Sequence, residues 1–101
     1  MTPEGRVKQA IKNCLNQLNI WYFMPAANGF GKVGVPDFIC CFDGKFFAIE
    51  AKAPGKRNNT TPNQNMRIQE IKNAGGWVIV VDDITQLKEF LDERAQERLQ
   101  S

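Results

Sequence analysis

Two carboxylates and a lysine are the residues best placed to do chemistry in this chain. Asp37 comes directly before the apolar run Phe38–Phe42, and Glu50 ends the run Phe46–Glu50, with Lys52 following shortly after. The sequence contains no histidine, which excludes the commonest general base, the triads that depend on it and most zinc sites. Chemistry in this chain therefore depends on carboxylates, lysine, amides or a hard cation with oxygen ligands.

The dipeptide Asp43-Gly44 lies between the two apolar runs and is a strong signal for a two-residue hairpin turn. A turn at this point places Asp37 directly opposite Glu50, and opposed residues have Cβ atoms about 4.5–5.5 Å apart. Two carboxylates that close repel each other unless a cation compensates. Glu50 and Lys52 share one strand face because side chains alternate. The register therefore predicts a cluster of Asp37, Glu50 and Lys52 that suits a divalent cation.

This cluster has an alternative interpretation, a solvated sheet end where Lys52 pairs two surface carboxylates. The functional interpretation is favoured because an apolar run leads straight into Glu50, and a charge at the end of a buried strand is costly unless it is paired or coordinated. Gln64 joins the candidates because it shares the inward face of a predicted helix, at the first turn, where anions are favoured. Its alternative role is to close a capping box with Thr61.

The elements that would hold the cluster follow from periodicity and turn residues. Helices are expected over 3–18 with Thr2 as N-cap, over 61–74, and from Asp83 onwards; strands are expected over 20–24 (an edge strand), 38–42, 46–50 and 77–81 (a buried strand). A glycine-rich loop is expected over 25–34 and a mobile basic loop over 53–61. This order predicts an α/β fold with a mixed central β-sheet flanked by helices.

Length and composition exclude several classes of protein. The 101 residues suit one domain, and 43% hydrophobic with 24% charged residues is the globular average. No run approaches the ~18 apolar residues of a membrane helix, and residues 1–4 lack the features of a signal peptide. We therefore expect one domain over residues 1–101, no membrane partner and a cytoplasmic location, where Cys14, Cys40 and Cys41 stay reduced.

The charge is distributed unevenly along the chain. Residues 1–72 hold ten Lys/Arg and five Asp/Glu, whereas residues 73–101 hold three and six. A basic body with an acidic final helix is compatible with a polyanionic partner.

The motif residues resemble those of a known family. Gly34-Val35-Pro36-Asp37, Phe47-Ala48-Ile49-Glu50-Ala51-Lys52 and Thr61-Pro62-Asn63-Gln64 are similar to motifs of the PD-(D/E)XK nuclease superfamily. The closest likeness is to the VRR-NUC (virus-type replication–repair nuclease) domain in its small stand-alone phage form. Residues 23–29 and Ala74-Gly75-Gly76 also resemble that form, so the likeness covers about residues 3–82.

The resemblance implies a PD-(D/E)XK (restriction-endonuclease-like) fold and metal-dependent endonuclease activity on the phosphodiester bonds of DNA. Asp37 and Glu50 would bind Mg²⁺ or Mn²⁺, with the carbonyl of Ala51 as a further ligand. Lys52 would position or activate the attacking water, and Gln64 would hold the site or a phosphate.

Other residues carry weaker predictions. Glu4 falls where the family often has a glutamate in the first helix, although a favourable charge in a first helical turn explains it equally well. Candidate phosphate contacts are Lys32, Lys56, Arg57 and Arg67. Gly29–Gly34 fits the spacing of a dinucleotide-binding motif, but a proline and a strand follow where that motif needs a helix, so no nucleotide cofactor is expected.

The expected assembly is a homodimer. Trp21, Tyr22 and Phe23 are consecutive on a short strand, so one sheet face does not bury all three, and surplus aromatic surface suits a contact between copies. The alternative is that they all lie in the core. Small members of the family resemble Holliday-junction resolvases, which implies branched, four-way DNA as substrate. Two other functions stay open: a catalytically weak nucleic-acid-binding module of the same fold, and a purely structural phage protein.

Overall fold

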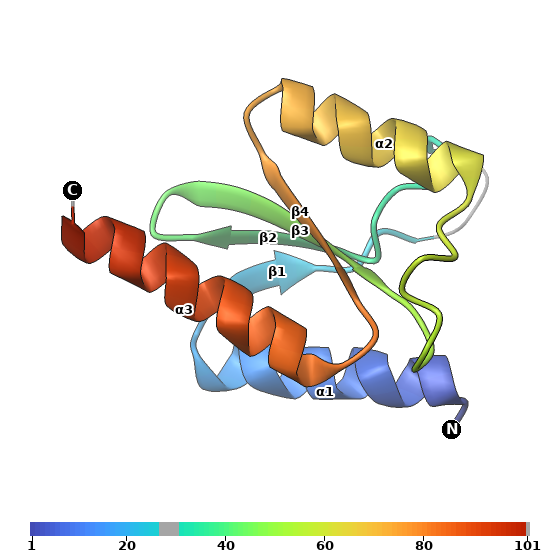
Figure 1. The fold of residues 1–101 in the computed structure, drawn as a ribbon, viewed down its shortest axis with the longest axis horizontal. Coiled ribbons are helices and arrows are strands. Elements are labelled where there is room, and N and C mark those ends of the chain that lie inside the picture. Colours follow the sequence, from blue (N-terminus) through green and yellow to red (C-terminus); the bar gives the residue numbers. More distant parts are fainter. Residues whose placement is uncertain (27–30, 101) are drawn as a thin grey trace.

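The structure is a computed structural model and describes residues 1–26 and 31–100. Its elements are α1 (Pro3–Gln17), β1 (Trp21–Phe23), β2 (Phe38–Phe42), β3 (Lys45–Ala51), α2 (Pro62–Asn73), β4 (Trp77–Val81) and α3 (Ile84–Gln100). They form a three-layer α/β arrangement, with the sheet between α2 on one side and α1 and α3 on the other (Figure 1). Part of the predicted glycine-rich loop, residues 27–30, lies outside the described residues.

The sheet is mixed, as the sequence predicted. Its strand order is β1-β2-β3-β4, with antiparallel β1–β2 and β2–β3 pairs and a parallel β3–β4 pair. The β2–β3 register is also confirmed, since Phe38 pairs with Ile49 and Phe42 with Lys45. Asp43 and Gly44 have φ angles of 54° and 74°, the left-handed values that a type I′ turn requires at both central positions.

One face of the sheet holds the hydrophobic core. Alternate residues of β2 and β3, such as Phe38, Phe47 and Ile49, pack with Ile11 of α1 and Leu87 of α3 in one buried cluster. The predicted N-cap of α1 is confirmed, since the Thr2 hydroxyl accepts a hydrogen bond from the backbone N–H of Gly5 at 3.0 Å. All three cysteines are free, as expected.

The strand β4 differs from its prediction. It lies at an edge of the described sheet, and Trp77 is 44% exposed, while only Val81 is buried. A continuous apolar run is typical of a strand covered on both faces. Here α2 covers β4 only partly, and no residue of α2 is fully buried. The expected edge strand at the other side of the sheet is confirmed as β1.

No helix within the described part of the chain is both long enough and apolar enough to cross a membrane.

Candidate active site

Asp37 lies immediately before β2 and contacts the end of β3. Its Oδ2 accepts a hydrogen bond from the backbone N–H of Ala51 at 2.8 Å. The N–H and C=O of a residue in an extended strand point to the same side, so the Ala51 carbonyl also faces the Asp37 side. The hairpin therefore brings together the three predicted metal ligands, Asp37, Glu50 and Ala51.

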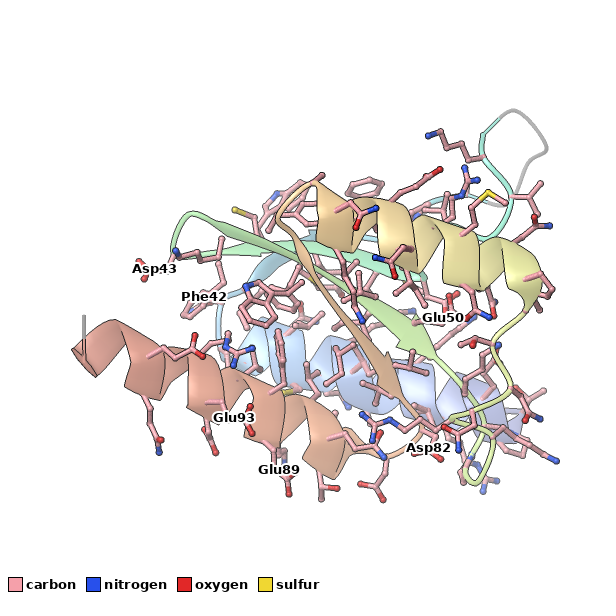
Figure 2. All side chains as sticks on the ribbon, turned by 45° about the horizontal axis from the view of Figure 1, so that its top comes forward. Phe42, Asp43, Glu50, Asp82, Glu89 and Glu93 are labelled. Carbon is pink, nitrogen blue, oxygen red and sulfur yellow. The ribbon has the colours of Figure 1, made fainter. Side chains whose placement is uncertain are left out.

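Among the charged side chains that the structure describes, Glu50 is buried most deeply, with only 3% of its surface exposed (Figure 2). It lies on the face of β3 opposite the core, beneath the first turn of α2. Burial, and after it the negative charge of Asp37, raise the pKa of Glu50 to about 8, although Lys52 opposes the shift. A carboxyl group in this environment gains most from a cation that takes up its charge when it ionises.

Gln64 connects the other members of the cluster. The ammonium of Lys52 donates to Gln64 Oε1 at 2.8 Å, and Gln64 Nε2 donates to Glu50 Oε2 at 3.3 Å. Gln64 Oε1 also accepts from the backbone N–H of Thr61 at 3.0 Å, which completes a capping box. Gln64 therefore closes the capping box and also contacts Glu50 and Lys52. We call Asp37, Glu50, Lys52 and Gln64 the carboxylate cluster.

Gly34 holds the loop before Asp37 against the start of α2. Its φ is +83°, and a Cβ atom at this position would lie 2.5 Å from the carbonyl carbon of Asn63. Only glycine allows so close an approach in this conformation. This contact fixes Asp37 relative to Gln64, which follows Asn63 in the first turn of α2.

Lys8 is a member of the site that the sequence reasoning missed. Its Nζ lies 3.6 Å from Asp37 Oδ1 and 3.4 Å from Glu4 Oε2. Partial burial lowers the pKa of Lys8, but the charges of Asp37 and Glu4 together outweigh this, and the net pKa is raised. Glu4, predicted as an accessory residue, therefore reaches the carboxylate cluster through Lys8. The signal available in the sequence was the spacing of Lys8, four residues after Glu4 and on the same helix side as Ile11.

The donor set fits a hard divalent cation. Two carboxylates, one on β3 and one directly before β2, and a carbonyl oxygen are ligands that Mg²⁺ accepts. Mg²⁺ commonly uses one or two protein carboxylates together with water and substrate phosphates. Over residues 1–26 and 31–100, no group of three or more His, Cys, Asp or Glu side chains is arranged to hold a metal. A cation at this site therefore depends on the backbone and on substrate for its remaining ligands.

The predicted phosphate contacts fall into two groups. Lys32 and Arg67 both pair with Glu70, at 3.6 and 3.5 Å, and the Arg67 side chain is only 15% exposed. The two cations therefore share one carboxylate, and the Lys32 side chain stays 69% exposed. Lys56 is exposed, whereas the Nε of Arg57 donates to the carbonyl of Val80 at 2.8 Å.

The loop over residues 53–61, predicted to be mobile, is tied to β4 and its end. The backbone N–H of Gly55 donates to Asp82 Oδ2 at 3.0 Å, in addition to the bond between Arg57 and Val80. The loop also makes backbone hydrogen bonds of its own, from the N–H of Lys56 to Ala53 and from that of Asn59 to Lys56. Composition alone gave no sign of these bonds.

Comparison with known proteins identifies no relative of this chain. No protein-family model matches the chain, and a search of curated proteins finds no match. The likeness to VRR-NUC domains therefore rests on the motif residues described above.

Proposed function

We propose that this chain is a metal-dependent endonuclease of the PD-(D/E)XK type that hydrolyses phosphodiester bonds in DNA. The observation that carries the proposal is the carboxylate cluster: a buried Glu50 beside Asp37, bridged by Gln64 to an ammonium group. A buried acid next to a second acid is destabilising in a merely structural site. It is useful where a cation and a phosphate are to be bound.

Asp37, Glu50 and the Ala51 carbonyl would hold Mg²⁺ or Mn²⁺. When bound, the metal supplies Lewis-acid stabilisation of a phosphoryl group and lowers the pKa of water. Lys52 is not a ligand; its ammonium, oriented by Gln64, positions the attacking water and offsets negative charge on the phosphate. Lys8 holds the Asp37 carboxylate from the other side.

The proposed assembly is a homodimer that presents two active sites to branched DNA. Trp21 is 61% exposed and Phe23 47% exposed, and their rings meet edge to face at 5.8 Å on the edge strand β1. These side chains supply the aromatic surface enriched in protein interfaces. A two-fold dimer offers two equivalent sites, which cleavage of both strands of a four-way junction requires.

The test is cleavage of linear, flap and four-way DNA with Mg²⁺, with Mn²⁺ and with chelator. We expect metal-dependent cleavage that falls at least about a thousandfold in Asp37→Asn and Glu50→Gln, because the metal contributes several kcal/mol to the transition state. Glu89→Gln, on the exposed side of α3 (Figure 2), is the matched control and should keep full activity. Full activity in Asp37→Asn or Glu50→Gln would contradict the assignment.

Lys52→Ala separates positioning from metal binding. It should abolish cleavage while calorimetric titration with Mn²⁺ still shows binding, since lysine is not a ligand. Loss of Mn²⁺ binding equal to that in Glu50→Gln would contradict the separate role of Lys52.

A second candidate function is a nucleic-acid-binding module without useful turnover. One observation favours it: Lys8 lies 3.6 Å from Asp37, so part of the carboxylate charge is compensated without a metal. DNA binding with no cleavage of any substrate in either metal would select this function, and no DNA binding would select a structural protein.

A further inference from the structure

A second concave surface lies beside the carboxylate cluster. It is a cavity of about 430 Å³ between α2, the loop over residues 53–61 and β4. Its polar lining consists of Arg57, Asn58, Thr60, Asn65 and Lys72, and residues 78–80 of β4 form the rest of its wall together with Ile68. We call it the basic cavity.

The lining of the basic cavity carries positive charge. It contains two cationic side chains, Arg57 and Lys72, and no carboxylate. The larger cavity of about 750 Å³, between the hairpin tip and α3 (Figure 2), has instead a mostly apolar lining in which Asp43 and Glu97 accompany two cations. Of these two cavities, only the basic cavity offers an uncompensated positive lining.

Two internal hydrogen bonds orient the donors of the basic cavity. The Nε of Arg57 donates to the Val80 carbonyl at 2.8 Å, which fixes the guanidinium and leaves its terminal N–H groups for other acceptors. The hydroxyl of Thr60 donates to Asn65 Oδ1 at 2.6 Å, so the amide group of Asn65 keeps its two N–H donors. A donor-rich, positively charged cavity matches the oxygens of a phosphate and its attached sugar.

The basic cavity is one strand away from the carboxylate cluster. Glu50 and Val80 are register partners on the parallel strands β3 and β4, and neighbouring strands lie about 4.8 Å apart. Their side chains share the α2 face of the sheet, and Asn65 follows Gln64 directly on α2. Lys72 follows Gln64 by eight residues of α2, about 12 Å along the helix axis, so the two sites lie a few nucleotides apart on a strand that rises about 3.4 Å per nucleotide.

We propose that the basic cavity holds one nucleotide of a single DNA strand, with its phosphate bound by Arg57 and Lys72, within a few nucleotides of the bond that is cut at the carboxylate cluster. The identity of the ligand as DNA rests on the proposed function, whereas its anionic character rests on the lining itself. The volume lies within the range of about 300–1,000 Å³ typical of small-ligand sites. The cavity thus fits one nucleotide unit of a strand separated from its complement, as at a branch point.

The test is the binding of a fluorescein-labelled ten-nucleotide oligothymidylate, followed by anisotropy in chelator so that cleavage does not contribute. Lys72→Gln should weaken binding roughly five- to tenfold at low salt and reduce the salt slope by about 0.7, the value for one single-strand phosphate contact. Lys88→Gln removes the same charge from an exposed position on α3, across the sheet, and should change neither quantity. Equal effects of the two substitutions, or wild-type binding by Lys72→Gln, would overturn the proposal.

Arg57→Lys provides a second variant that keeps the charge but loses the guanidinium fork. It should weaken binding with little change in salt slope, and wild-type affinity in this variant would count against the proposal. The outcome is independent of catalysis. If the wild-type protein cuts DNA while Lys72→Gln binds as wild type does, the basic cavity is refuted and the nuclease stands. If no metal supports cleavage while Lys72→Gln selectively loses binding, the nuclease is refuted and the cavity stands.

Discussion

The sheet has α1 and α3 on one side and α2 on the other (Figure 1). The face under α1 and α3 is filled with apolar side chains, whereas the face under α2 carries the carboxylate cluster, the basic cavity and exposed aromatic rings. Both faces are built by the same strands, since neighbouring residues point to opposite sides. Ile49 is fully buried in the core, and the next residue, Glu50, belongs to the site. A single strand thus joins the most stabilising layer of the protein to its most polar one.

The difference between the faces shows how the site is held in place. The core face holds β2 and β3 in place, so Glu50 is positioned by a strand and Asp37 by its place directly before a strand. The α2 face is covered by one helix whose inner residues are only half-buried, which leaves room for a ligand. The acidic residues Glu89 and Glu93 lie on α3, on the far side of the sheet from α2 (Figure 2), so they do not repel an anion at the α2 face.

The largest expected effect is the loss of a core aromatic ring. Phe38→Ala should lower the free energy of unfolding by about 3–5 kcal/mol, because Phe38 is fully buried and its removal leaves a cavity. Phe23→Ala, on the α2 face of the neighbouring strand, should cost less than about 1 kcal/mol, because Phe23 is 47% exposed. Urea denaturation measures both. Equal losses would remove the distinction between the faces.

The next effect concerns the contact between the loop that precedes Asp37 and the start of α2. Gly34→Ala should destabilise the protein by about 2–4 kcal/mol, since alanine disfavours φ of +83° and its Cβ would overlap the backbone of Asn63. Gly44→Ala is the matched control, because Gly44 has φ +74° but open space around it. Both variants share the cost of a positive φ, so the difference between their unfolding free energies, measured by heat or urea, gives the cost of the steric overlap at Gly34. No difference would mean that α2 moves aside to accommodate the Cβ atom.

Much of this arrangement was predictable because its signals are local. Asp43-Gly44 fixed the hairpin register and with it the approach of Asp37 to Glu50, and the start of α2 at Thr61 defined the place of Gln64. These features depend on turn and cap chemistry that acts within a few residues.

The parts that escaped prediction depend on tertiary packing. Lys8 meets Asp37 only because α1 packs beside the start of β2, and no local pattern gives that distance. The pairing of Lys32 and Arg67 with Glu70 depends equally on where a loop passes α2. A continuous apolar run such as that of β4 occurs both in central strands and in edge strands that are partly covered by a helix. Composition therefore did not reveal that β4 is partly exposed.

A smaller effect is expected from pH on the α2 face. The pKa of Glu50 is raised in the folded protein to about 8 from an ordinary value of 4.5, first by burial and then by Asp37. The native state therefore holds a proton that the unfolded chain has released, and the stability from this group is complete below pH 4.5 and is lost as pH rises to about 8. The loss amounts to at most a few kcal/mol.

Glu50→Gln provides the reference for that measurement. The difference in unfolding free energy between wild type and Glu50→Gln, measured without metal, should move in favour of the variant between pH 4.5 and 8. Phe38, on the other face of the sheet, has no titratable group and therefore contributes no such pH dependence. A difference that stays constant over this range would show that Glu50 is ionised at neutral pH in the metal-free fold.

The smallest effect on the fold is expected at Trp21, which is exposed on the α2 face of the edge strand β1. If this aromatic surface joins two copies, light scattering at micromolar concentration should give about twice the chain mass of 11.4 kDa for the wild type and the single mass for Trp21→Ser. Phe42→Ser is the control, since Phe42 is 41% exposed but lies at the hairpin tip on the other face, and it should leave the dimer intact.

The secondary structure of Trp21→Ser, followed by circular dichroism, should not change, because a 61% exposed side chain contributes little to the core. A wild-type mass near 11.4 kDa would exclude the dimer, and a dimer that survives Trp21→Ser would place its interface elsewhere. In either case the exposed rings of Trp21 and Phe23 would not form a contact between copies.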